Sequence, residues 1–206
     1  PKGVAVIERL AFCDNSSLTS VIFENNSELK EIGSYAFLND TSLTNIIIPA
    51  SVTKIGYYTF AEALLLTIYA EIMEKPINWD DTWNHSGRPV IWGIKKHGVY
   101  QDKRYVVTSS DTIIILGQDF AGAKTDLIIP LIIDDYPVIS IQAYAFYKNT
   151  QVQSIYIPAG IISIGENAFK GAINIIINAE DSLKPSGWDD NWNPDNQEVN
   201  WGYILS

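Results

Sequence analysis

Apolar and small residues recur along the chain in a short pattern, Ile-Gly-x-x-Ala-Phe. Clear copies end at Phe37, Phe60, Phe146 and Phe169, and a degenerate copy spans Ile7–Phe12. Successive phenylalanines within a group are 23 or 25 residues apart. A fixed period in the low twenties is typical of a solenoid, in which each coil is a strand, a turn and a return leg. We therefore expect the phenylalanines to stack from coil to coil as an interior spine.

A leucine or valine lies six residues after most of these phenylalanines and is followed by a β-branched apolar run. Two of the runs, Ile46–Ile48 and Ile155–Ile157, end directly before a proline. Such runs favour strands, and proline ends them because it donates no backbone hydrogen bond. One coil is too thin to bury its own apolar side chains, so neighbouring coils must pair their strands into a parallel sheet. The glycine of the motif is expected to supply a positive φ or a close backbone approach at the turn.

A longer repeat of 109 residues lies over the short one and relates, for example, Trp79 to Trp188. The chain is therefore predicted to hold two blocks. The first covers residues 1–93, with coils in 1–71 and a tryptophan module in 72–93; the second covers 94–206, with an N-terminal hairpin in 100–118, coils in 119–180 and a tryptophan module in 181–206. The hairpin is predicted because Tyr105–Val107 and Ile113–Ile115 flank a turn-forming Ser-Ser-Asp. We expect it to cover the open edge of the second block's sheet.

The two tryptophan modules share ten nearly identical residues, KPINWDDTWN from Lys75 and KPSGWDDNWN from Lys184. The two tryptophans of each segment are four residues apart and would share one face of a helical turn. Asn78 is placed to cap that turn, and Gly187 stands at the same point in the second copy. The predicted role is a lid over the last spine residues, Phe60 and Phe169.

Two alternatives for these modules involve ligands. Exposed tryptophan beside carboxylates can hold a sugar, and the candidate carbohydrate-binding residues are Trp79, Asp80, Trp83, Trp188, Asp189 and Trp192. The second alternative is a calcium site built from the carboxylate and amide oxygens of Asp80, Asp81, Asn84, Asp189, Asp190 and Asn193. Their spacing lacks the Asp-x-Asp-x-Asp-Gly pattern of a calcium loop. We expect no metal and no cofactor.

Charge and composition narrow the function further. The 24 acidic and 14 basic residues give a net charge of −10, which repels nucleic acid and anionic membrane surfaces. No apolar run approaches the roughly 20 residues of a membrane span. His85, His97 and the single Cys13 match no catalytic or metal-binding motif, so we expect no enzyme. Because the chain opens at Pro1 rather than with Met and no leader begins it, we interpret it as a mature or excised segment.

Strand alternation identifies a candidate protein-binding strip on the concave face of the coils. Side chains that alternate with the predicted core positions turn outward. The strip consists of Ile22, Ile47, Tyr69, Ile128 and Tyr156, flanked by Thr44 and Gln153. A continuous exposed apolar strip is typical of an interaction site, although β-propensity on a solvated face would give the same residues. Charge substitution of Ile47 and Tyr156 is predicted to weaken partner binding without unfolding the protein.

The repeat, the proline-ended strands and the closing Lys-Pro-x-x-Trp-Asp-x-x-Trp-Asn segment together resemble the BspA-like leucine-rich repeat proteins of bacteria and some mucosal protists. The resemblance implies a leucine-rich repeat solenoid: a strand-rich right-handed coil with a parallel concave sheet, short convex strands or turns, and short helical tryptophan-containing terminal modules. It also implies a secreted or cell-surface, non-enzymatic adhesion scaffold, whose partners would be host extracellular-matrix or bacterial surface proteins. A carbohydrate-binding module and a purely structural spacer remain the alternatives.

Overall fold

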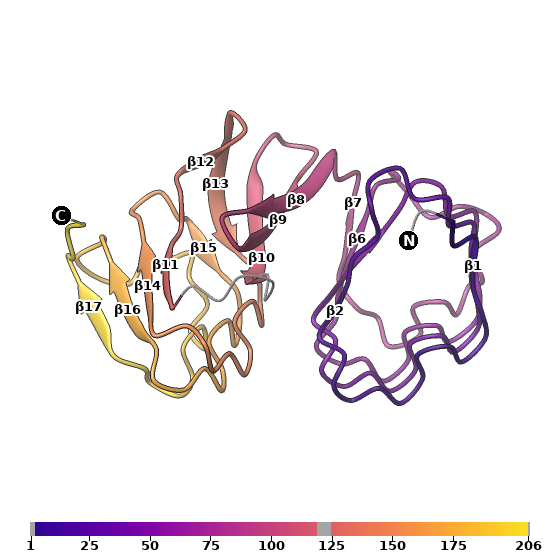
Figure 1. Ribbon diagram of the computed structural model, residues 1–206, viewed down its shortest axis with the longest axis horizontal. Helices are drawn as coiled ribbons and strands as arrows, with labels where there is room; N and C mark the ends of the chain where they lie inside the picture. The colour runs from indigo at the N-terminus through magenta and orange to yellow at the C-terminus, as the bar shows by residue number, and fades with distance from the viewer. Residues whose placement is uncertain (1–2, 119–124, 206) are drawn as a thin grey trace. The chain divides into compact units, whose positions relative to one another are not determined.

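The computed structural model describes residues 3–118 and 125–205, and the chain folds into two compact units, Pro1–Ile94 and Lys95–Ser206 (Figure 1). The sequence placed the block boundary between residues 93 and 94. Within the described ranges the regular structure is β-strand and turn, with no α-helix. The first six residues of the predicted coil segment 119–180 lie outside the described residues.

Unit 1 contains two parallel sheets that share one set of coils. The main sheet has the strand order β2-β4-β6-β7, and the second sheet has the order β1-β3-β5. The strands of the main sheet are β2 (Ser20–Val21), β4 (Asn45–Ile48), β6 (Thr67–Ala70) and β7 (Val90–Trp92), and those of the second sheet are β1 (Val6–Ile7), β3 (Glu31–Ile32) and β5 (Lys54–Ile55). Ile46 is in register with Val21 on one side and Ile68 on the other. The predicted strand-rich solenoid with a parallel sheet is confirmed.

Unit 2 repeats this plan and adds antiparallel strands at its start. Its main sheet has the order β11-β14-β16-β17, while β10, β13 and β15 form the parallel part of its second sheet. The main-sheet strands are β11 (Asp126–Ile128), β14 (Ser154–Ile157), β16 (Ile176–Ala179) and β17 (Val199–Trp201), and the others are β8 (Lys96–Tyr100), β9 (Lys103–Val107), β10 (Ile113–Gln118), β12 (Ile132–Ile133), β13 (Tyr136–Ile141) and β15 (Ser163–Ile164). The β9–β10 hairpin pairs Val107 with Ile113, and β8 extends it by one further antiparallel strand. Because β10 pairs with β13, the hairpin covers the edge of the second sheet.

Each spine phenylalanine lies between two residues with left-handed backbone, two positions before and two positions after it. These residues are Leu10 and Asp14, Tyr35 and Asn39, Tyr58 and Glu62, Tyr144 and Lys148, and Asn167 and Gly171, with φ between 52° and 71°. In this segment alternate amides point along the stack: Phe37 N–H donates to Thr59 O at 2.9 Å, whereas Ala36 N–H closes the local turn on Gly33 O at 3.2 Å. The turn therefore bonds to its neighbour coil much as a strand does.

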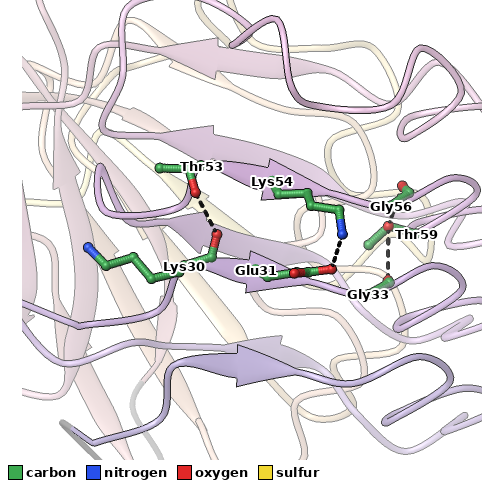
Figure 2. Close-up of polar contacts among 7 residues, drawn as sticks. All are labelled: Lys30, Glu31, Gly33, Thr53, Lys54, Gly56 and Thr59. Atoms are coloured by element: carbon green, nitrogen blue, oxygen red, sulfur yellow. Dashed lines mark hydrogen bonds and ion pairs between the residues drawn. The ribbon is translucent and has the colours of Figure 1, made fainter.

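The motif glycine is required by close approach and not by its own φ. A Cβ on Gly56 would lie 2.4 Å from Ser34 N, and one on Gly33 would lie 2.5 Å from Arg9 N. Figure 2 shows this region: the hydroxyl of Thr59, which replaces the motif alanine, lies 2.7 Å from Gly56 O and 3.2 Å from Gly33 O. Beside it the Lys54 ammonium and the Glu31 carboxylate, from adjacent strands, are 2.6 Å apart. The second sheet is thus joined by side chains as well as by its backbone.

The phenylalanines form the predicted spine. Phe12, Phe37 and Phe60 stack with ring centroids 5.2 Å and 5.6 Å apart, and Phe146 stacks on Phe169 at 5.2 Å. Each unit has its own cluster of buried apolar residues, and the two clusters share no residue. Ile46 and Ile48 point into the cluster of unit 1, and Ile155 and Ile157 occupy the same places in unit 2. The remaining strand positions therefore face outward.

Candidate functional site

The tryptophan modules are a further coil of the solenoid and not helical lids. Residues 77–78 and 81–86 form turns, and the backbone of the module bonds to the preceding coil. Asp80 N–H donates to Ile55 O at 2.9 Å, and Tyr58 N–H donates to Thr82 O at 3.1 Å. The predicted helix is therefore wrong. Phe60 to Trp83 is a step of 23 residues, the same as the repeat, and this was the signal that the sequence interpretation missed. Trp83 packs edge-on against Phe60 at 5.9 Å, in the position of the next spine residue.

The polar residues of the first module that recur in the second serve the module's own folding. Asp80 Oδ1 accepts a hydrogen bond from Thr82 N–H at 2.8 Å, and Lys75 Nζ pairs with Asp81 at 2.7 Å. Asn84 closes a short loop by two hydrogen bonds with the backbone of Arg88, at 2.8 and 2.9 Å. The second module repeats these contacts with Asp189, Lys184 and Asp190, and Asn193. The repeated segment is therefore accounted for by architecture.

The predicted carbohydrate site on the modules has no exposed aromatic platform. All four tryptophans of the prediction are buried in the unit cores: at most 5% of the surface of each residue is exposed in Trp79, Trp83, Trp188 and Trp192. A sugar stacks on an open ring face, so these four rings are unavailable, and this part of the prediction is wrong. For the calcium alternative, no three His, Cys, Asp or Glu side chains gather in a metal-binding group in the described part of the chain.

The outward positions of the two main sheets differ sharply in exposure. In unit 1, Ile47 and Tyr69 are register neighbours on the face opposite the core, yet only 3% and 1% of their surface is exposed. Thr44 is buried as well, and only Ile22 of the predicted unit 1 residues is open to solvent. The prediction that Ile47, Tyr69 and Thr44 are exposed is wrong. Alternation fixes the face that a side chain takes, whereas exposure depends on what lies against that face.

The unit 2 residues of the predicted strip lie on an open surface, which we call the unit 2 outer face. It is made of two register rows, Asp126-Ser154-Ile176 and Ile128-Tyr156-Asn178-Asn200. Ile128 is 48% exposed, Tyr156 is half-buried, and Gln153 lies exposed at the start of β14. The sequence interpretation missed Ile176, Asn178 and Asn200, although extending the same alternation by one period would have found the first two.

The unit 2 outer face combines apolar, aromatic and amide groups. Tyr156 lies beside Tyr203, with ring centroids 6.3 Å apart, and Asn200 Nδ2 donates to Asn178 Oδ1 at 2.9 Å. Burial, together with the nearby Glu180 carboxylate, raises the pKa of Tyr156, so its hydroxyl stays protonated at neutral pH. The face can therefore donate and accept hydrogen bonds around an apolar centre.

Elsewhere the chain shows little reactive chemistry. Cys13 Sγ donates to Asp14 Oδ2 at 3.0 Å, and this bond is the main cause that raises the pKa of the thiol to about 11. The thiolate required for nucleophilic attack is therefore scarce at neutral pH.

The described residues include no helix long and apolar enough to cross a membrane.

The sequence profile of the BspA type leucine rich repeat region matches residues 1–74 and 124–186, in six copies. The chain belongs to this family. In this BspA-type chain, the matched residues hold the phenylalanine coils, whereas the β8–β10 strands and most of both tryptophan modules lie outside the match. The unit 2 outer face is thus built mainly from family coils and completed by β17 of the last module.

No curated protein matches this BspA-type chain. Among solved structures, a leucine rich cell surface protein from Faecalibacterium prausnitzii is 17% identical, with 91% of this chain and 60% of that chain covered and a TM-score of 0.43. The pneumococcal vaccine antigen PcpA is 18% identical, with 92% and 50% covered and a TM-score of 0.43. A leucine-rich repeat protein from Bacteroides capillosus is 21% identical, with 52% and 99% covered and a TM-score of 0.38. The chain therefore spans only 50 to 60% of the first and the pneumococcal protein.

Proposed function

We propose that this protein is a non-enzymatic binding scaffold, and that the unit 2 outer face is the surface through which it contacts a protein partner. The observation that carries the proposal is the grouping of three residues on one face of the sheet: Ile128 lies beside Tyr156 in one register row, and Ile176 lies in the neighbouring row. Ile128 and Ile176 are exposed and Tyr156 is half-buried. Exposed apolar groups ringed by polar ones mark interaction surfaces, and aromatic residues are enriched at the centre of such surfaces.

Membership of the family supports the proposal that this scaffold is an adhesin on the outside of a bacterial cell. The resemblance to BspA-like proteins implies a secreted or cell-surface protein, and one structural neighbour is described as a cell surface protein. Host extracellular-matrix proteins and other bacterial surface proteins are the partners that such a setting provides. The net charge of −10 favours a partner with a neutral or basic contact surface.

The composition of the unit 2 outer face disfavours the alternative that this protein is only a structural spacer between other domains. A spacer needs a solvated face rich in lysine and glutamate, whereas the seven register positions of this face carry two isoleucines, a tyrosine, two asparagines, a serine and a single aspartate. Apolar side chains held in water on a rigid sheet cost solubility, so their presence is better explained by a partner that covers them.

The proposal is tested by placing a charge at the centre of the unit 2 outer face. Binding of the chain to immobilised collagen, laminin and fibronectin is measured by surface plasmon resonance, for the natural chain and for Ile128→Asp and Tyr156→Asp. Both variants are expected to weaken binding at least about tenfold, because a carboxylate would have to be desolvated in the interface. Ile47→Asp is unsuitable, because Ile47 is buried and its substitution would test stability.

The matched control is Ile173→Asp, which places the same charge on an exposed isoleucine of unit 2 outside the main sheet. It is expected to bind as the natural chain does, and all three variants should keep its thermal unfolding midpoint. Binding that is equal in the control and in the two face variants would show that the unit 2 outer face is not the contact surface.

A further inference from the structure

A cleft of about 460 Å³ opens in unit 1, between the end of β5 and the first tryptophan module. Its walls include Lys54 and Tyr57 from the coil and Ile77, Asn78 and Asp80 from the module. Ile77 is 95% exposed and Tyr57 is 41% exposed, so both apolar groups face water. The volume lies in the range of about 300–1,000 Å³ that is usual for small-molecule sites.

The first tryptophan module carries Asn78 at a position where the second module lies close against its coil. Its counterpart in unit 2 is Gly187, where a Cβ would lie 2.3 Å from Ile162 O. Asn78 carries that Cβ, so its own backbone cannot approach the coil as Gly187 does. Consistent with this, the indole Nε1 of Trp188 donates to Ile161 O at 2.9 Å, whereas the Nε1 of Trp79 has no hydrogen-bond partner among the described residues.

Three further side chains that line the cleft are specific to unit 1. The 109-residue repeat places Ser163, Glu166 and Ser186 where unit 1 has Lys54, Tyr57 and Ile77. Unit 2 therefore lacks the aromatic ring and the exposed aliphatic group, although it keeps the same fold and the buried tryptophans. Architecture alone does not require these residues, because the second copy folds without them.

A row of aromatic rings leads from the cleft across neighbouring coils. Tyr57 contacts Tyr35 edge-on at 4.9 Å, Tyr58 packs beside both rings, and His85 lies 4.4 Å from Tyr58. The row ends at Arg9, whose guanidinium lies over the Tyr35 ring at 5.5 Å. In unit 2 the positions of Tyr57 and Tyr58 hold Glu166 and Asn167. The described part of unit 2 therefore does not repeat the row.

We propose that the cleft and the adjoining tyrosine row bind a neutral oligosaccharide. Sugar rings present both apolar faces and hydroxyl groups, and this surface offers an open tyrosine ring beside the amide of Asn78 and the carboxylate of Asp80. The lysine at the cleft is already paired, because Lys54 Nζ lies 2.6 Å from the Glu31 carboxylate, so an anionic ligand would have to break this ion pair. A row of rings across coils suits an extended chain of sugar units better than a single one.

The test is a titration of ¹⁵N-labelled full chain with linear hexasaccharides of glucose, mannose and N-acetylglucosamine, followed by NMR. At least one hexasaccharide is expected to shift the backbone amides of residues 54–57 and 77–81, with a Kd on the order of 1 mM or tighter. Tyr57→Glu and Ile77→Ser, which copy the residues of unit 2, should each weaken binding at least about tenfold while the unfolding midpoint is retained.

The matched control is Tyr147→Ala, which removes a half-buried tyrosine of unit 2 and should leave the affinity unchanged. The proposal is overturned if none of the three hexasaccharides shifts these amides at about 10 mM. It is equally overturned if Tyr57→Glu and Tyr147→Ala weaken binding to the same extent. Because the cleft and the unit 2 outer face share no residue, either result leaves the protein-binding proposal intact.

Discussion

Stacked phenylalanines hold neighbouring coils together, and Phe37 lies between two others. Phe37 is fully buried, with Phe12 on one side and Phe60 on the other, and its ring is nearly parallel to both. Phe37→Ala is expected to cost about 3–5 kcal/mol of unfolding free energy, because it leaves a cavity between two rings. Urea denaturation of the two proteins measures this cost. Phe12→Ala is the control: Phe12 is 39% exposed, so its loss should cost clearly less, and equal costs would contradict the spine.

Asp40 is a single residue that destabilises the fold at neutral pH. It is buried, Oδ1 accepts a hydrogen bond from Asn15 N–H at 2.9 Å, and Oδ2 has no partner in the described part of the chain. Burial is the main cause that raises its pKa from 3.8 to about 6. Because the folded protein then holds a proton that the unfolded chain has released, its stability falls as the pH rises from about 4 to about 6.

Removal of this charge should flatten that pH dependence. Asp40→Asn is expected to raise the unfolding free energy at about pH 7 by on the order of 1 kcal/mol and to change it little at about pH 4. Urea denaturation at both values measures this. Asn149 occupies the same place in unit 2, where its amide donates a hydrogen bond to Gln118 Oε1 and accepts one from Val152 N–H. An asparagine is therefore compatible with the fold at this position. An Asp40→Asn variant that is less stable at about pH 7 would refute the assignment.

At the scale of the element, the tryptophan module behaves as a shortened coil, and this has a measurable consequence. Trp83 takes the place of a spine phenylalanine against Phe60 and packs against Trp79 at 4.9 Å. Trp83→Phe should therefore be tolerated at a cost of about 1.5 kcal/mol or less, whereas Trp83→Ala should cost about 3–5 kcal/mol. Thermal and urea unfolding of both variants compare these costs. Similar losses in the two variants would mean that Trp83 is not a spine residue.

The sequence predicted the elements where one physical rule was sufficient. The period placed the phenylalanines in a stack, and alternation placed Ile46 and Ile155 in the cores. The tryptophan module was misassigned because a four-residue spacing fits one turn of a helix and also fits this coil, and the 23-residue step from Phe60 to Trp83 is what separates them. Residue propensity does not predict the conformation of the coils either. The residues with left-handed backbone that shape the coils include Leu10 and Tyr35, and leucine and tyrosine rarely adopt this conformation.

The candidate site was predictable only in part, since exposure is not encoded in alternation. Tyr156 and Ile47 occupy the same place in the two blocks and point away from their cores, yet one is half-buried and the other is nearly inaccessible. The cleft of unit 1 could not be found from a motif, because it depends on Ile77 and Asn78, which stand where the second copy of the repeated segment has Ser186 and Gly187.

At the scale of the whole molecule, the solenoid limits how far a disturbance spreads. Each coil bonds only to its neighbours, and the two apolar clusters share no residue. Phe169→Ala should therefore speed amide hydrogen exchange in β14, β15 and β16 of unit 2 much more than in β4, β5 and β6 of unit 1. Phe37→Ala is the reciprocal control and should give the opposite pattern. If either variant accelerated exchange equally in both units, the coils would unfold as one cooperative body, and the nearest-neighbour account of this protein's stability would fail.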